Sequence, residues 1–160
     1  MPLKIIGAFL LSAAGLGFGC TRARRLTQRR EFLGRVLTFI SCLSTELRYR
    51  NDDIFSLVNS CGELFQVSQI GSSPFYSSWR ACIGKLRRRW SLTPRDMDLL
   101  DELGSRLGTT DSEGQLTHLA HYRALFERQL AEARADAEQK TKLYKTLGLF
   151  AGVSAAIMLL

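Results

Sequence analysis

Two stretches at the ends of the chain decide its organisation: IIGAFLLSAAGLGFGCT at residues 5–21 and TLGLFAGVSAAIMLL at residues 146–160. Neither contains a charged side chain. A helix that crosses a bilayer core needs roughly 20 apolar residues, with a lower limit of about 17. Both stretches are short by this measure, but Lys4 and Lys145 can extend them by laying their methylene stems along the edge of the core. We therefore predict a transmembrane helix at each end, within residues 1–21 and 146–160.

Two other interpretations of these stretches agree less well with the sequence. A buried helix of a soluble domain would have a polar rim, and neither stretch shows one. A cleaved signal peptide is the stronger rival at the N-terminus, because Gly17-Phe18-Gly19-Cys20 faintly resembles a lipoprotein cleavage box. Gly17, however, stands where a Leu-like residue belongs, and the arginines that follow at once oppose translocation.

The charges that flank the two stretches predict their orientation. Basic residues near the ends of a membrane helix stay on the cytoplasmic side. Such residues follow the first stretch and precede the second, whereas the outer flanks carry only Lys4 and the chain termini. The inner set is Arg22, Arg24, Arg25, Arg29, Arg30, Lys140, Lys142 and Lys145. We expect residues 22–145 to be cytoplasmic and both termini to lie outside the cell membrane, so the formal net charge of +7 is partly a topology signal.

Each apolar stretch also contains two glycines four residues apart. The pairs are Gly15 with Gly19 and Gly148 with Gly152. This spacing puts both glycines of a pair on one helix face, where small residues let membrane helices approach closely. Chance is the competing explanation, because glycine is frequent in membrane helices. We interpret the pairs as packing sites, either between the two spans or against the span of a partner.

Between the stretches the sequence predicts one helical domain. Residues 22–145 are enough for a domain with its own core, and both prolines and alternating β-branched residues are scarce there. The cysteines, at positions 20, 42, 61 and 82, form no CxxC pair, which argues against disulfides and a zinc site in a reducing compartment. The predicted fold is all-α: a cytoplasmic helical bundle flanked by two terminal transmembrane helices that continue into long helices.

Apolar residues at three- and four-residue spacing mark the helices of this domain. The first is predicted to run from the membrane to about Arg50. A second carries apolar residues from Ile54 to Phe65, and a third from Phe75 to Trp90. The first two faces consist of Leu33, Val36, Leu37, Ile40, Leu43 and Leu47, and of Ile54, Phe55, Val58, Cys61 and Phe65.

Two further helices have recognisable starts. Thr93 before Pro94, with Asp96 three residues after Thr93, combines an N-cap hydroxyl, a proline in the first turn and a carboxylate at the positive end of the dipole. Gly108 is expected to close that helix.

The last helix is expected to begin near residue 110. Thr110 with Glu113 resembles a capping box, and Asp111 and Gln115 are expected to organise the same helix start rather than to bind a partner. The helix can then run through Lys145 into the second apolar stretch, because it contains no proline.

The sequence contains no catalytic constellation that we recognise. His118 and His121 lie three residues apart, but no carboxylate or cysteine at local spacing completes a metal site. The basic run 87–89 lacks the aromatic platform of a nucleic-acid binder, so we expect a solvated face or contact with lipid headgroups. We predict a protein that is not an enzyme, holds no metal or cofactor and binds no nucleic acid.

Four motifs, in order and at matching distances, resemble the stage III sporulation protein AB family. They are ARRL at 23–26 after the first span, TELRY at 45–49, LGTTDSEGQ at 107–115, and KLYKTLG at 142–148 before the apolar tail. The family often has a glycine after the tyrosine and a Thr-Pro turn soon after. This chain has Arg50 and then Asn51-Asp52-Asp53 instead, so the local turn differs from the family pattern.

The resemblance implies a function that the residues alone do not. The family belongs to a secretion-like channel complex, formed during engulfment, that connects the mother cell with the forespore. The family is similar to inner-membrane platform proteins of type II secretion and type IV pilus systems. It implies a location in the mother-cell membrane around the forespore, with the ATPase stage III sporulation protein AA, other members of the channel complex and membrane lipid as partners. A homo-oligomer is compatible with it.

As a docking face for that ATPase we predict Arg24, Arg25, Glu46 and Tyr49 on the first long helix. Glu46 and Tyr49 are three residues apart and reach the same side. The competing reading of Glu46 is an ion pair with Arg50, four residues on. A general adaptor of a secretion or pilus system outside sporulation is the alternative function, and a membrane-bound enzyme with an unrecognised site is a further one.

Overall fold

The computed structural model describes the backbone of residues 2–50, 52–62, 64–68 and 74–159. Side chains are described from residue 21 to 154, apart from residues 22, 51, 63, 69–73, 88, 141, 144, 145, 148, 149 and 151–153. Within this part all regular structure is helical, which confirms the all-α class. The chain divides into two compact units: unit 1, Met1–Arg30 with Glu132–Leu160, and unit 2, Glu31–Ala131. Residues 22–30 and 132–145, predicted to belong to the central domain, are therefore grouped with the chain ends.

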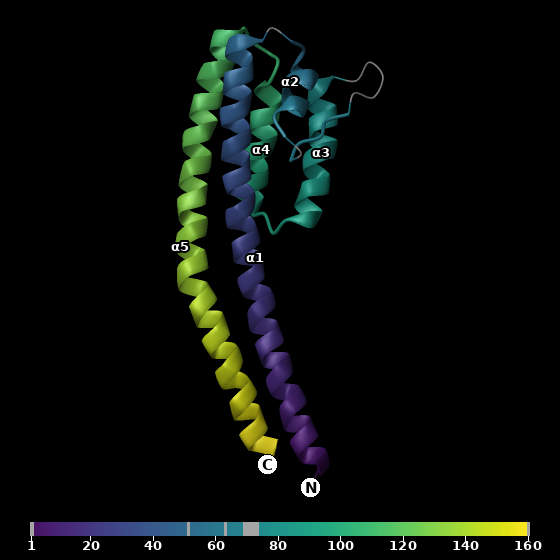
Figure 1. Cartoon of the computed structure of the whole chain (residues 1–160), viewed down its shortest axis with the longest axis vertical. Helices are drawn as coiled ribbons and strands as arrows, with labels where there is room; N and C mark the ends of the chain where they lie inside the picture. The colour runs from purple at the N-terminus through teal and green to yellow at the C-terminus, as the bar shows by residue number, and fades with distance from the viewer. Residues whose placement is uncertain (1, 51, 63, 69–73, 160) are drawn as a thin grey trace. The chain divides into compact units, whose positions relative to one another are not determined.

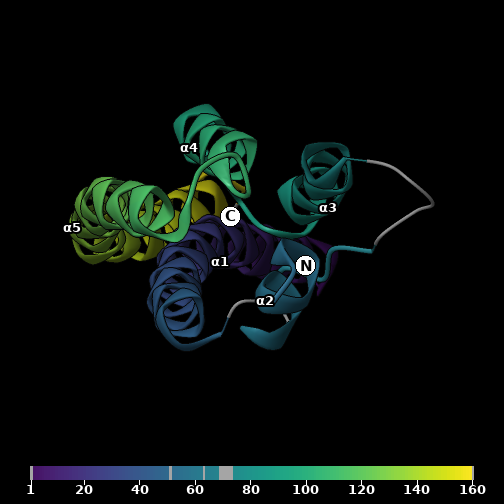
Figure 2. The same ribbon diagram turned by 90° about the horizontal axis from the view of Figure 1, so that it is seen from above.

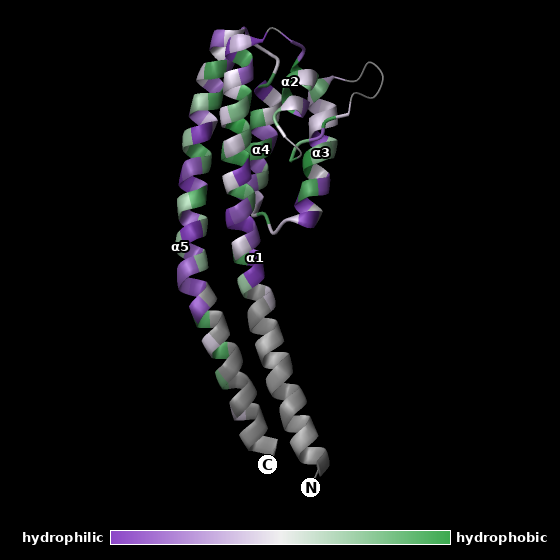
Figure 3. Ribbon diagram, in the orientation of Figure 1, coloured by the Kyte–Doolittle hydropathy of each residue, from purple (hydrophilic) through white to green (hydrophobic). Residues whose placement is uncertain are grey.

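Two long helices begin and end the fold. α1 spans Pro2–Tyr49 and α5 spans Ser112–Leu159, so both predicted long helices are continuous (Figure 1). Along their described parts, hydrophobic and hydrophilic residues are interspersed (Figure 3). This pattern lets each helix bury one face and hydrate the other.

α2 is shorter than predicted. It spans Ile54–Ser60, begins at the N-cap Asp53, whose carboxylate accepts a bond from the Phe55 amide, and ends at Cys61. Gly62 follows with a φ of 121°, a backbone conformation that favours glycine and cannot continue a helix. The prediction that Phe65 belongs to this helix is wrong: Phe65 lies in the irregular segment after it.

That irregular segment is nevertheless fixed to α2. The Asn59 side chain accepts a bond from the Val67 amide at 2.8 Å and donates to the Val67 carbonyl at 3.0 Å. Both backbone groups of Val67 are thereby satisfied without regular structure. Phe65 and Val67 are almost wholly buried as a result.

α3 and α4 follow the predicted boundaries. α3 spans Phe75–Arg89, with Trp90 as its C-cap, and α4 spans Pro94–Arg106. Thr93 and Asp96 form a reciprocal capping box: the Asp96 amide donates to the Thr93 hydroxyl, and the Thr93 amide donates to the Asp96 carboxylate at 2.9 Å. Gly108 follows the C-cap Leu107 with a φ of 77°. The chain can therefore turn directly from α4 towards α5.

Unit 2 has one core. In the end-on view its helical segments surround this core in the order α1, α5, α4, α3 and α2 (Figure 2). The wholly buried side chains come from all five helices and from the irregular segment after α2. They include Phe32, Leu33, Val36, Ile40, Leu43, Val58, Phe65, Trp79, Leu100, Leu119 and Phe126.

Trp79 on α3 is the centre of an aromatic cluster in this core. Its ring stacks on Phe65 at a centroid distance of 4.7 Å and lies 6.0 Å from Phe75 and 6.3 Å from Phe39. The indole Nε1 donates to the Leu100 carbonyl of α4 at 2.8 Å. A β-carbon built on Gly104 would overlap the indole ring. The ring can therefore pack against the α4 backbone only because Gly104 has no side chain.

Unit 1 consists of residues 2–30 of α1 and 132–159 of α5. Its buried described side chains are small, namely Ala23, Ala133 and Ala137, with the exception of Arg29. Arg29 is only 8% exposed and has interaction partners within the structure. It therefore has a structural role besides its contribution to the flanking charge.

Among the described residues, no helix is both long enough and apolar enough to cross a membrane.

The contact between Trp79 and Gly104 yields a test with a matched control. Gly104→Ala should destabilise the protein by about 1–3 kcal/mol, because overpacking outweighs the gain in helix propensity of about 1 kcal/mol. Gly84→Ala in α3, where nothing lies within 4 Å of an added β-carbon, should instead stabilise it by about 0.5–1 kcal/mol. Thermal unfolding of the full chain in detergent, followed by circular dichroism, measures both. Equal midpoints for the two variants would contradict the described contact.

Candidate functional site

A cavity of 280 Å³ lies at one end of unit 2, where the α1–α2 connection meets the α4–α5 connection. The end of α1, the start of α2 and the turn between α4 and α5 all contribute to its lining. Polar side chains dominate the lining, namely Arg50, Asp52, Asp53, Asp111 and Gln115. These residues come from two segments far apart in the sequence, so only the tertiary fold brings them together.

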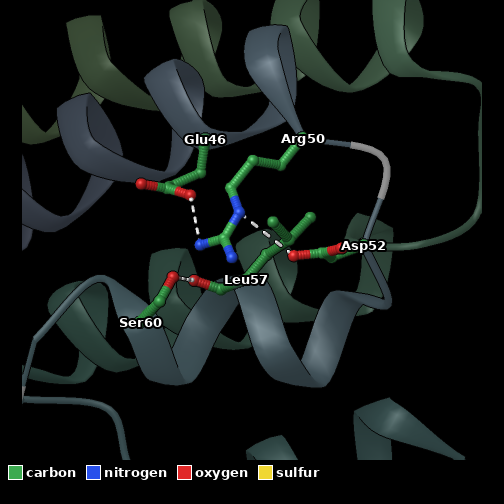
Figure 4. Close-up of polar contacts among 5 residues, drawn as sticks. All are labelled: Glu46, Arg50, Asp52, Leu57 and Ser60. Atoms are coloured by element: carbon green, nitrogen blue, oxygen red, sulfur yellow. Dashed lines mark hydrogen bonds and ion pairs between the residues drawn. The ribbon is translucent and has the colours of Figure 1, made fainter.

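Arg50 joins the end of α1 to the connection before α2. Its Nη1 lies 3.2 Å from Glu46 Oε2 and its Nε lies 3.1 Å from Asp52 Oδ2 (Figure 4). The hydrogen bond that Arg50 donates to Glu46 is the largest cause of a raised pKa of the Arg50 guanidinium, followed by the charges of Asp52 and Glu46. All three side chains are partly exposed, so the pairs contribute little to stability and mainly hold the geometry of the turn.

The start of α5 forms the facing part of the lining. Asp111 precedes Ser112, the first residue of α5; its carboxylate accepts from the Gly114 amide at 3.2 Å and its carbonyl from the Gln115 amide at 2.9 Å. The capping side chain is thus that of Asp111, one residue beyond the Thr110 of the expected capping box. Thr110 instead offers its carbonyl to Gln115 Nε2 at 3.1 Å, and Glu113 is exposed.

Gln115 is the least exposed polar residue of this lining. It is 7% exposed, and its Oε1 is buried without a hydrogen-bond partner. Sequence reasoning assigned Gln115 to the helix start, which agrees with its position. The sequence alone does not indicate that the oxygen of this amide lacks a hydrogen-bond partner. Whether it has one depends on which segments of the fold cover the side chain.

The predicted docking residues fall in different units. Arg24 and Arg25 are exposed in unit 1; in unit 2, Tyr49 is 83% exposed. Glu46 is half-buried and pairs with Arg50, the competing reading of that residue. The docking role of these residues stays a prediction.

The predicted glycine pairs lie outside the residues whose side chains are described. They are Gly15, Gly19, Gly148 and Gly152.

Two cysteines that seemed scattered in the sequence interact in unit 2. Cys61, at the end of α2, is a free thiol whose pKa is raised to about 12. Burial is the first cause, because it disfavours the thiolate, and the neighbouring Cys42 thiol of α1 is the second. Burial likewise raises the pKa of Cys82. The thiols of Cys61 and Cys82 are thus poor nucleophiles at neutral pH.

Other ionisable side chains of unit 2 have structural roles or stand apart. Asp96 is committed to its capping box, and Asp101 accepts a bond from the Tyr76 hydroxyl at 2.8 Å, the first cause of a raised Tyr76 pKa. His118 is half-buried and His121 is exposed. Among the residues included in the description, no three His, Cys, Asp or Glu side chains are grouped as a metal site would require.

The raised pKa of Cys61 predicts slow alkylation. At pH 8 its thiolate population should be lower than that of an ordinary cysteine by about two to three orders of magnitude. Iodoacetamide labelling of the full chain in detergent, followed by peptide mass spectrometry, should show a correspondingly slow rate at Cys61. In the Cys42→Ala variant the rate should rise only partly, since burial remains. The urea-unfolded chain serves as the control with an ordinary rate, and equal rates in folded and unfolded protein would contradict this account.

Comparison with known proteins places this helical chain in a family. The family model for stage III sporulation protein AB matches residues 4–160. Stage III sporulation protein AB of Bacillus subtilis (strain 168) is 23% identical over 170 aligned residues, which cover 99% of each chain. No solved structure matches. Because the family model matches almost the whole length, the chain belongs to the stage III sporulation protein AB family.

Proposed function

We propose that this protein is a non-enzymatic membrane platform of the sporulation channel between mother cell and forespore. In this role it docks the cytoplasmic ATPase stage III sporulation protein AA at the mother-cell membrane around the forespore. The observation that carries the proposal is the family match over residues 4–160, which supports a role in sporulation. The platform role and the named partner go further and rest on the resemblance to secretion-system platform proteins.

The chain ends support anchoring in the membrane. Both end stretches lack charges, and arginines and lysines flank them on the inner side. Leu143, Leu147 and Phe150 on α5 are 54%, 54% and 64% exposed. Their spacing of four and three residues puts them on one helix face, an apolar stripe suited to contact with lipid.

Several carboxylates of unit 2 are occupied in helix caps and ion pairs, which supports an adaptor rather than an enzyme. Asp53, Asp96 and Asp111 cap helices, and Glu46 and Asp52 pair with Arg50. The family is named for sporulation and not for a reaction. The alternative, an adaptor of a secretion or pilus system outside sporulation, has less support because the family is named for sporulation.

Tyr49 is the strongest single candidate for contact with the ATPase. A tyrosine that is 83% exposed contributes little to the fold, but it offers an aromatic anchor of the type that dominates protein interfaces. Arg24 and Arg25, exposed in unit 1, would provide charge that steers association. Glu46 is a weaker candidate, because a partner would have to compete with Arg50 for it.

The anchoring predicts a labelling pattern in intact cells. In a background in which the four native cysteines are alanine, Ala124→Cys on an exposed position of α5 should resist a membrane-impermeant maleimide until the cells are permeabilised. Lys4→Cys, on the opposite side of the predicted first span, should react at once. The native cysteines are removed because the raised pKa values of Cys61 and Cys82 would slow their reaction with maleimide even where these thiols are accessible. Prompt labelling of Ala124→Cys in intact cells would overturn the topology.

The docking role predicts a selective loss of the ATPase. Tyr49→Ser should lower recovery of stage III sporulation protein AA with the full chain, purified from membranes containing the whole assembly, by about tenfold, the loss expected for an interface anchor. Stability should change by less than about 0.5 kcal/mol, because the residue is on the surface. His121→Ser, an exposed ring on α5, is the matched control and should leave recovery unchanged. If wild-type protein does not recover the ATPase at all, the coupling role loses its basis.

A further inference from the structure

α2 packs along the end of α1 and runs in the opposite direction (Figure 4). Leu57, in the middle of α2, lines a cavity together with Leu47 near the end of α1. Cys61, the C-cap of α2, lines another cavity of 340 Å³ together with Thr38, which lies earlier on α1. Cys42 is one helical turn after Thr38 and therefore on the same face of α1, between the two contacts. The packing of the two helices thus places Cys42 opposite Cys61.

The Cys42 and Cys61 thiols form a pair in unit 2. Both are free and partly exposed. Burial is the first cause of the raised pKa of Cys61, and a hydrogen bond with the Cys42 thiol is the second. Cys82 stands in a different environment: it is buried, and besides burial its pKa responds to a backbone hydrogen bond with Gln66 and to the charge of Lys85. The helix packing and the environment of the thiols therefore agree that Cys42 and Cys61 are neighbours.

A pair of neighbouring thiols has a reaction that a single cysteine lacks. Oxidation of a lone accessible thiol stops at the sulfenic acid or proceeds irreversibly to sulfinic and sulfonic acids. A second thiol beside it converts the sulfenic acid into a disulfide, from which a reductant restores both thiols. In a reducing compartment, where this part of the chain is predicted to lie, such a pair rests as two thiols and its disulfide is transient. The free thiols of the structure correspond to that resting state.

We propose that Cys42 and Cys61 form an oxidation-sensitive dithiol, which a hydroperoxide converts into a disulfide between α1 and the end of α2. The cavity of 340 Å³ that Cys61 lines gives a small hydroperoxide access to the pair. This inference goes beyond the proposed platform function and does not depend on it, because it concerns only contacts within unit 2.

Cys42 makes the first attack, since the raised pKa of Cys61 leaves little of the Cys61 thiolate at neutral pH. The Cys42 sulfur attacks the terminal oxygen of the hydroperoxide, the O–O bond breaks, and the alcohol leaves with the proton of the Cys42 thiol. Cys42 is then a sulfenic acid. The Cys61 sulfur attacks the Cys42 sulfur, the S–O bond breaks, and the hydroxyl leaves as water with the proton of the Cys61 thiol. The two thiols are thereby oxidised to a disulfide, and the hydroperoxide is reduced to an alcohol and water.

The test uses the full chain in detergent micelles, with hydrogen peroxide as the probe. A variant with Cys20→Ala and Cys82→Ala retains only the proposed pair. Peptide mass spectrometry without reductant should find most of its chains with a disulfide between Cys42 and Cys61, and dithiothreitol should restore both thiols. The matched control, Cys20→Ala with Cys61→Ala, retains Cys42 and Cys82 and should form no disulfide within the chain.

Two single variants identify the residue that is oxidised first. In Cys61→Ala, Cys42 has lost the thiol that would resolve it and should accumulate as sulfenic acid, which dimedone traps. In Cys42→Ala, dimedone labelling at Cys61 should be at least about tenfold lower, because burial keeps that thiol protonated. Equal labelling of the two variants would overturn the order of attack.

The disulfide should also change the stability of the chain. It closes a loop from residue 42 to residue 61, which restricts the unfolded chain and should raise the midpoint of thermal unfolding by about 5–10 °C. Reduction should abolish this increase, and the control that lacks Cys61 should not show it. Wild-type protein that forms no disulfide between Cys42 and Cys61, or that joins either residue to Cys20, Cys82 or another chain instead, would reject the proposal even if a variant fails to fold.

Discussion

Unit 2 depends on the contact between an indole ring and a stretch of helix backbone that carries no side chain. Trp79 of α3 lies against Gly104 of α4 and donates to the Leu100 carbonyl at 2.8 Å. The indole can approach so closely only because Gly104 has no β-carbon. This approach also brings Trp79 into contact with Phe65, so the irregular segment after α2 is attached to the same point. Loss of a wholly buried aromatic of this kind costs about 3–5 kcal/mol.

The core explains why the polar end of unit 2 has a defined geometry. Apolar residues on α1, α4 and α5 fix the helices, and the α1–α2 and α4–α5 connections are short. The end of α1 and the start of α5 therefore meet across the cavity, with Arg50 and Asp111 on its lining. Burial is non-directional, but a packed core fixes positions, and fixed positions hold polar side chains from separate segments beside one another. Such a preformed polar face is compatible with the docking role that we propose.

The helices with strong local signals were predictable, and the irregular parts were not. Thr93, Pro94 and Asp96 specify a helix start by local bonds alone, and the structure has that capping box. Phe65 has the right spacing for α2, yet Gly62 ends the helical path and the ring reaches the core from an irregular segment. Periodicity could not distinguish the two, because a buried ring satisfies the same pattern in either state. At α5 the cap is Asp111 rather than Thr110, a choice between adjacent residues that depends on how the chain arrives from α4.

The sequence by itself determined the all-α class, the two long helices, most helix starts and the motifs of the stage III sporulation protein AB family. These features depend on local spacing, capping chemistry and order along the chain, all of which can be read residue by residue. The tertiary structure alone decided that Cys42 and Cys61 are neighbours, that Arg29 is buried, and that Gln115 faces an acidic cavity with one acceptor unpaired. These are relations between segments far apart in the sequence, and burial and pKa are set by whatever the fold places beside a group rather than by its neighbours in the chain.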